Sequence, residues 1–317
     1  MALKRKLLQN SSILILLSLV MIGCTSDEEI WTQELGKSAI EARIAVDKLG
    51  RHLSSGTISK ASLLKQYATV VKRQSPELSE LIDTLALDAG QDGPSYKSLV
   101  NRLKEANAAR PNVPKQGGKA VQAAAVEYLA IKNASRPEVY GMMLTDPINV
   151  LADMSNGKLG RVEALSKEAS LIANGAKDYG AGSQLVGNPQ YGNWRSDSSG
   201  GSFWEWYGKY ALFSSLFRSP IYYGGWANSR NYSYYGEAGR HYYSSPRQQT
   251  NNRQVQTRTR NKFQREGRRF QSPYAKSKAG SRAASMQGNS FKVSRASRMA
   301  SARSGSSRTS RGSFSGK

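Results

Sequence analysis

The chain has 317 residues and a mass of 34.7 kDa, and 46 Lys and Arg against 23 Asp and Glu give it a formal net charge of +23. Its single cysteine excludes an internal disulfide, and two histidines without further cysteines exclude the common zinc sites. Only one apolar run approaches the length needed to span a bilayer, which excludes a polytopic membrane protein.

The N-terminal residues have the layout of an export signal. Residues 4–6 are Lys-Arg-Lys, and residues 13–22 form an apolar run that is interrupted only by Ser18. Ten apolar residues are too few to cross a membrane, but they suit the core of a signal peptide. We therefore expect the chain to be exported.

The apolar run ends in Met21-Ile22-Gly23-Cys24, which holds the only cysteine of the chain. This motif resembles the lipobox of bacterial lipoproteins, with methionine where leucine is usual. The resemblance implies removal of residues 1–23, lipid attachment at Cys24 and a membrane anchor. It also implies the outer membrane if two membranes are present, because Thr25 stands where an aspartate would favour retention in the inner membrane. The alternative is an ordinary secretory signal, or an uncleaved anchor, with a cysteine there by chance.

Residues 24–175 have the pattern of a mainly α-helical domain, and we expect a small antiparallel helical bundle. Apolar residues spaced alternately by four and three form one stripe of a first long helix: Trp31, Leu35, Ala39, Ala42, Val46, Leu49 and Leu53. Residues 110–118 contain two prolines and two glycines and are predicted to be a loop. Further helices are predicted over residues 59–72, 75–90, 95–106, 120–132 and 159–174. Asp146 and Pro147 are predicted to be the N-terminal cap and first position of another helix, which leads into Val150 and Leu151.

Residues 176–245 form a segment rich in glycine, tyrosine and tryptophan, with 17 aromatic residues between Tyr191 and Tyr243. Residues 203–217 have the spacing of one amphipathic helix, and the Tyr-Tyr pairs that follow are predicted to be short strands or turns. The aromatic residues have three interpretations: a core packed on the helices, a contact with the membrane interface, or a platform for sugars. For the latter two, the candidate aromatic surface is Trp204, Trp206, Tyr210, Trp226, Tyr234 and Tyr235.

Residues 246–317 hold 18 Lys and Arg and a single acid, Glu266, whereas residues 24–245 are nearly balanced, with 25 Lys and Arg and 22 Asp and Glu. Because this tail has few aliphatic residues, we predict that it is disordered. Arginines interleaved with aromatic residues are typical of RNA binding, but export excludes intracellular nucleic acid as the partner. The tail is predicted to bind anionic lipid, lipopolysaccharide or acidic polymer, with these candidate residues: Arg258, Arg260, Arg265, Arg268 and Arg269.

Signs of catalysis are few. The sequence has no dinucleotide fingerprint, phosphate loop or zinc-protease motif, so no cofactor is expected. His52 is predicted to lie on a helix surface, and His241 to contact the aromatic cluster. A glycosidase needs only two carboxylates brought together by the fold, and the candidates near the aromatic segment are Asp178, Asp197, Glu205 and Glu237.

Two functions from different classes follow from these patterns. The first is a non-enzymatic cell-envelope lipoprotein, anchored at Cys24, whose basic tail binds anionic envelope components. The alternative is an enzyme or accessory protein acting on cell-wall glycans through the aromatic segment and the carboxylates.

Overall fold

The computed structural model describes residues 27–217 and 219–279. Residues 1–26, with the lipobox-like motif and Cys24, and residues 280–317 of the basic tail lie outside this part of the chain. The described chain is mainly helical, as predicted, with one two-stranded sheet. Its longer helices are α2 (Asp27–Ser54), α3 (Ser59–Gln74), α4 (Ser79–Ala86), α5 (Pro94–Ala108), α6 (Val113–Ala134), α8 (Thr145–Met154), α9 (Lys167–Asn174) and α13 (Pro246–Arg265).

Helix α2 confirms the predicted apolar stripe. Its stripe residues Leu35, Val46 and Leu49 are at most 2% exposed, because they face α5, α6 and the rest of the core. Three acids lie in the first turn of α2 and Arg51 in its last turn, which suits the helix dipole.

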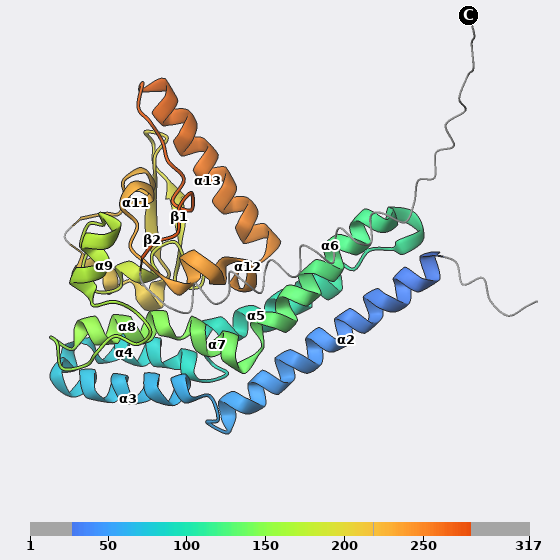
Figure 1. Ribbon diagram of the computed structural model, residues 1–317, viewed down its shortest axis with the longest axis horizontal. Coiled ribbons are helices and arrows are strands. Elements are labelled where there is room, and N and C mark those ends of the chain that lie inside the picture. The colour runs from blue at the N-terminus through green and yellow to red at the C-terminus, as the bar shows by residue number, and fades with distance from the viewer. Residues whose placement is uncertain (1–26, 218, 280–317) are drawn as a thin grey trace, which may run out of the picture.

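Helices α2, α5 and α6 pack together and form the elongated part of the molecule (Figure 1). Helices α2 and α5 are antiparallel, since Gly50 lies beside Tyr96 and Arg110, just after α5, reaches back to the carbonyl of Thr32. Helices α2 and α6 run in the same direction. Near their starts Gly118 lies against the ring of Trp31, and further along both helices the Lys132 ammonium lies 2.8 Å from Glu41. The pair α2 and α5 thus has the antiparallel order expected of neighbouring helices, whereas α2 and α6 are parallel.

Helix α6 begins inside the predicted loop at residues 110–118. Pro114 falls in its first turn, where the missing proline N–H is tolerated. In place of the predicted loop, the helix has a kink at Gly117, which has a φ of +66°. Glycine adopts this left-handed conformation without the clash that a Cβ would cause.

Helices α3, α4 and α8, with α7 (Pro137–Met143), form the layer below the aromatic segment in Figure 1. One hydrophobic core joins Leu64 of α3 and Ile148 of α8 to aromatic residues such as Tyr191 and Trp226. Helix α9 is shorter than the predicted 159–174, because the side chain of Ser166 caps it by accepting a hydrogen bond from Ala169.

The predicted helix over residues 203–217 is wrong. Strands β1 (Gly192–Ser196) and β2 (Ser202–Trp206) form an antiparallel hairpin with Trp194 opposite Trp204. Alternate β2 residues are buried, which is the period of two expected of a strand. Only short helical turns follow, at Gly208–Tyr210 and in α10 (Phe213–Leu216).

The tyrosine pairs predicted to be strands or turns lie mostly in short helices: α11 (Tyr223–Ser229), a π-helical turn (Tyr235–Gly239) and α12 (Arg240–Tyr243). Tyr222 keeps some strand character through an isolated bridge to Phe203. Each of these short helices buries a tyrosine in the hydrophobic core: Tyr223, Tyr235 and Tyr243. Tertiary packing of these rings stabilises helices that are too short to be stable alone.

The predicted disorder from residue 246 is wrong for the first part of the tail, because Pro246–Arg265 form helix α13. Ser245 and Gln248 form a capping box at its start. The helix also buries one stripe, spaced by four: Val255, Thr259 and Phe263. These two features stabilise a helix whose other residues are almost all polar.

Candidate functional site

The six residues of the candidate aromatic surface are in the core. Each is at most 6% exposed, so they do not form a surface for membrane or sugar. The ring of Trp194 lies 5.1 Å from the rings of both Trp204 and Trp226, and Trp206 packs on Phe213 at 4.7 Å. The interpretation of the segment as a core packed on the helices agrees with this arrangement.

The five candidate anion-binding arginines are exposed, and three of them lie on α13. This helix carries five Arg and one Lys and has no acid. Arg253 and Arg260 are two turns apart on one side of its buried stripe, and Arg258 and Arg265 are two turns apart on the other. Arg268 and Arg269 come after Glu266 and Gly267, and Arg268 pairs with Glu266 at 2.9 Å. We call α13 with these two residues the cationic helix.

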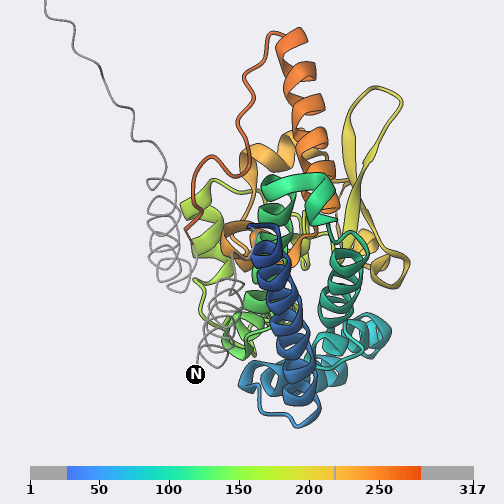
Figure 2. The ribbon, with the colours of Figure 1, turned by 90° about the vertical axis from the view of Figure 1, so that its right-hand side faces the viewer.

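Contacts with the β-hairpin and α11 fix the cationic helix in place (Figure 2). The Arg258 guanidinium donates to the Ser196 hydroxyl at 2.7 Å, and the Lys262 ammonium donates to the Ser199 carbonyl at 3.2 Å. A Cβ on Gly224 of α11 would lie 2.8 Å from the Phe263 ring, so this glycine permits the close approach. The helix therefore presents its arginines on a rigid support.

Two buried carboxylates join the aromatic segment to the helices. Asp88 accepts hydrogen bonds from the Tyr191 hydroxyl at 2.8 Å and from the Ser95 N–H at 2.9 Å. Asp146 of α8 accepts from the backbone N–H groups of Tyr234 and Tyr235. Burial raises the pKa of both carboxyl groups, that of Asp146 to about 6.

Both carboxylates are hydrogen-bonded to N–H or hydroxyl groups of other segments of the protein, which favours a role in joining these segments. The expected N-terminal cap at Asp146 is wrong: its side chain is turned toward the aromatic segment and bonds no N–H of its own helix. Sequence alone gave no sign of either role, because the partners lie up to 103 residues away.

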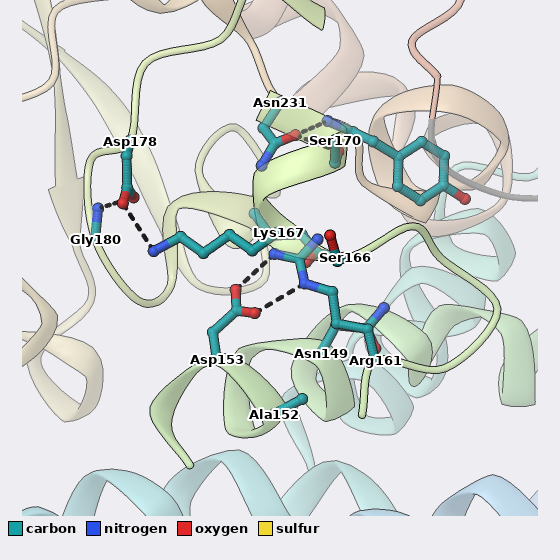
Figure 3. Close-up of polar contacts among 12 residues, drawn as sticks. Asn149, Ala152, Asp153, Arg161, Ser166, Lys167, Ser170, Asp178, Gly180 and Asn231 are labelled. Atoms are coloured by element: carbon teal, nitrogen blue, oxygen red, sulfur yellow. Dashed lines mark hydrogen bonds and ion pairs between the residues drawn. The ribbon is translucent and has the colours of Figure 1, made fainter. Parts of the chain in front are cut away.

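A second group of polar contacts lies between α8 and α9 (Figure 3). The Arg161 guanidinium donates two hydrogen bonds to the Asp153 carboxylate, at 2.8 and 2.6 Å, and both side chains are less than 10% exposed. Beside this pair, Lys167 lies 2.9 Å from Asp178. The Arg161–Asp153 pair holds the loop between α8 and α9, and the Lys167–Asp178 pair joins the start of α9 to the segment that follows it.

A polar pocket with a volume of about 300 Å³ lies where three distant segments meet. Helix α5 supplies one wall, the residues flanking the hairpin supply a second, and the start of α13 supplies the third. The lining residues are Pro94, Lys97, Ser98, Asn101, Arg102, Glu105, Pro189, Gln190, Tyr207, Ser245 and Gln248. The sequence analysis missed this pocket, because no local motif connects residues so far apart in the chain.

The residues considered for catalysis are not brought together. Asp178 pairs with Lys167, and Glu205 with Arg195. Asp197 accepts from Gly201 in the hairpin turn, and Glu237 pairs with the buried Arg230. These are separate local contacts. Among the described residues no group of three His, Cys, Asp or Glu is placed to hold a metal ion.

The two histidines also have ordinary surroundings. His52 lies near the end of α2, where its Nδ1 is 2.8 Å from the Thr57 hydroxyl, and it is partly exposed, as expected of a helix surface. His241 lies in α12 within the aromatic segment, and burial lowers its pKa.

Comparison with known proteins gives no guide to the activity: no family model, curated protein or solved structure matches this chain. Within residues 27–217 and 219–279, no helix has both the length and the apolar content needed to cross a membrane.

Proposed function

We propose that this protein is a non-enzymatic, lipid-anchored cell-envelope protein whose cationic helix binds anionic envelope components, either lipid headgroups, lipopolysaccharide or acidic polymer. The exposed arginines of α13, on a helix without a single acid, are the observation that carries the proposal. The lipobox-like motif at Cys24 supports attachment to a membrane in the envelope. In this proposal residues 24–175 supply a small helical body, and the remaining basic tail adds further charge.

The physical basis is a sum of weak contacts. A Lys or Arg near an anionic bilayer contributes about 1 kcal/mol at most. Several arginines held on one rigid helix engage an anionic surface together, without the cost of ordering a flexible chain for each contact. The interaction weakens as salt rises, because the screening length falls to about 3 Å at 1 M.

The test uses the full chain reconstituted through its anchor into phosphatidylcholine vesicles, so that the anchor is already occupied. Capture of separate phosphatidylglycerol vesicles is measured at low and high salt. Replacing Arg253, Arg260 and Arg265 with glutamine removes three exposed charges and keeps the hydrogen bonds from Arg258 and Lys262 to the hairpin. We expect capture to fall by up to about a hundredfold, from about 1 kcal/mol for each of three charges.

The matched control removes three exposed charges from α2 instead: Arg43, Lys48 and Arg51, each replaced with glutamine. This variant has the same net charge as the α13 variant. If net charge alone governs binding, the two variants lose capture equally, and the assignment to the cationic helix fails. Capture that persists undiminished at 1 M salt also contradicts the proposal.

A further inference from the structure

The polar pocket has the size and the rigidity of a small-molecule site. Its volume of about 300 Å³ lies at the lower end of the range found for such sites, about 300–1,000 Å³. The walls are held by the buried side chain of Arg102 and by the capping box of Ser245 and Gln248. The guanidinium of Arg102 binds both carboxylate oxygens of Glu127 and also donates to the carbonyl of Tyr242. Arg102 lines the pocket, and with 3% of its side chain exposed it connects α5, α6 and α12.

Two glutamines of the lining are oriented by hydrogen bonds to their side-chain oxygens. The Gln190 Oε1 accepts a hydrogen bond from the Ser95 hydroxyl. The Gln248 Oε1 accepts from the Ser245 N–H at 2.9 Å in the capping box. Gln190 is only 5% exposed, and among the described residues its Nε2 has no hydrogen-bond partner. This nitrogen is enclosed by protein atoms, so Gln190 supports the pocket wall and does not present its amide to the pocket space.

The charges of the pocket are largely neutralised by neighbours. Arg102 is paired with Glu127, and the Lys97 ammonium lies 3.2 Å from Asp92. The Ser95 N–H at the start of α5 is already bound to Asp88. A strong anion would therefore find little unpaired positive charge here, in contrast to the cationic helix.

What remains in the lining is the chemistry that recognises sugars. Asn101 and Ser98 add an amide and a hydroxyl to the Gln248 amide, and Glu105 adds a carboxylate acceptor. Tyr207 is 39% exposed and presents an amphipathic ring at the wall. The C–H face of a sugar packs on such a ring while its hydroxyl groups bond to the amides and the carboxylate.

We infer that the polar pocket between α5, the hairpin base and the start of α13 binds a neutral saccharide, with Asn101 and Gln248 as hydrogen-bonding residues and Tyr207 as the packing surface. The site is distinct from the buried aromatic residues first considered for sugars. It does not depend on anion binding by the cationic helix, although both use α13.

The experiment measures saccharide binding to the full chain in detergent by isothermal titration calorimetry and saturation-transfer NMR. The probes are the neutral trisaccharides chitotriose, maltotriose and cellotriose, with heparin as an anionic polymer. Tyr207→Ala and Asn101→Ala change exposed side chains, so the fold is expected to persist, and a thermal melt checks this. Tyr222→Ala is the matched control, since Tyr222 is 53% exposed and lies outside the pocket lining.

We expect at least one neutral trisaccharide to bind, with an affinity that is unchanged between 0.05 and 1 M salt. The screening length falls from about 10 Å at 0.1 M salt to about 3 Å at 1 M, but a neutral ligand has no net charge for salt to screen. Tyr207→Ala and Asn101→Ala should each weaken binding by about tenfold or more, equivalent to about 1.4 kcal/mol, and Tyr222→Ala should not. The inference is overturned if none of the three trisaccharides binds, or if both pocket variants bind as well as the wild type. Binding of heparin alone overturns it too, and that result would leave anion binding by the cationic helix standing.

Discussion

The Asp146 carboxylate accepts a hydrogen bond from the backbone N–H of Tyr235 at 3.0 Å, across 89 residues of sequence. The same carboxylate accepts from the Tyr234 N–H at 2.8 Å and from the Gln184 amide at 2.7 Å. Two backbone donors that would otherwise be buried without partners are thus satisfied by one side chain of α8. This contact fixes the aromatic segment on the helical layer below it.

The first prediction concerns pH. Burial raises the pKa of Asp146 to about 6, above the value of about 3.9 in an unfolded chain. The folded state therefore binds this proton more tightly, and its contribution to stability is full below about pH 4 and is lost as pH rises through about 6. The loss amounts to about 3 kcal/mol, since each pKa unit corresponds to about 1.4 kcal/mol.

Urea unfolding between pH 4 and 7.5 measures this effect. The Asp146→Asn variant cannot ionise at this position, so its free energy of unfolding should fall less steeply with pH than that of the wild type. Asp47→Asn, at an exposed position of α2, is the control and should follow the wild-type slope. Parallel profiles for wild type and Asp146→Asn would show that the carboxyl titrates normally in the folded state.

The second prediction tests the apolar stripe of α2. Leu49 is fully buried, so Leu49→Asp places an unpaired charge in the core and should lower the free energy of unfolding by several kcal/mol, about 3 or more. Ile44→Asp makes the same kind of change on the same helix at a position that is 53% exposed, and should cost about 0.5 kcal/mol or less. Circular dichroism during urea unfolding provides the measurement. Similar losses in the two variants would mean that Leu49 is not packed in solution.

The third prediction concerns the buried ion pair in Figure 3. Arg161→Met leaves the Asp153 carboxylate buried without its partner and should destabilise the fold by about 3–5 kcal/mol. The double variant Arg161→Met with Asp153→Leu removes both charges and should recover much of this loss, because an apolar pair of similar volume avoids desolvation. Equilibrium unfolding of both variants supplies the comparison, and a double variant no more stable than the single one would argue against burial of the pair.

The fourth prediction is lipid attachment at Cys24. Cells fed a palmitate analogue should label the wild-type protein but not Cys24→Ser, because the thiol is the only one in the chain. Thr25→Ser changes the neighbouring residue and should keep the label. A wild-type protein that takes up no label would contradict the lipid anchor and leave an ordinary secretory signal as the interpretation.

Sequence patterns predicted the structure correctly where the geometry that they determine lies within one short segment. The stripe containing Leu35 and Leu49 predicts α2, because residues at alternating spacings of three and four lie on one face of any helix. The proline and glycine residues around the start of α6 indicated a real irregularity, which is the kink at Gly117. These features depend on backbone geometry within a few turns.

The aromatic segment shows where local patterns failed. Residues 203–217 match a helical period, yet 202–206 form a strand, since pairing with β1 and packing of Trp204 against Trp194 outweigh the local preference. The candidate aromatic surface failed for a related reason: composition counts aromatic rings but does not say whether the fold buries them.

By itself, the sequence determined the mainly helical class, the long first helix and the concentration of positive charge toward the C-terminus, because each is a property of composition or of short-range period. The capping box at Ser245 is a local signal for the start of a helix over residues 246–265, but the tertiary structure adds what a polar segment lacks, because Val255 and Phe263 are buried against the body. Only the tertiary structure decided the polar pocket: its walls come from α5, the hairpin base and α13, and only long-range packing brings those segments together.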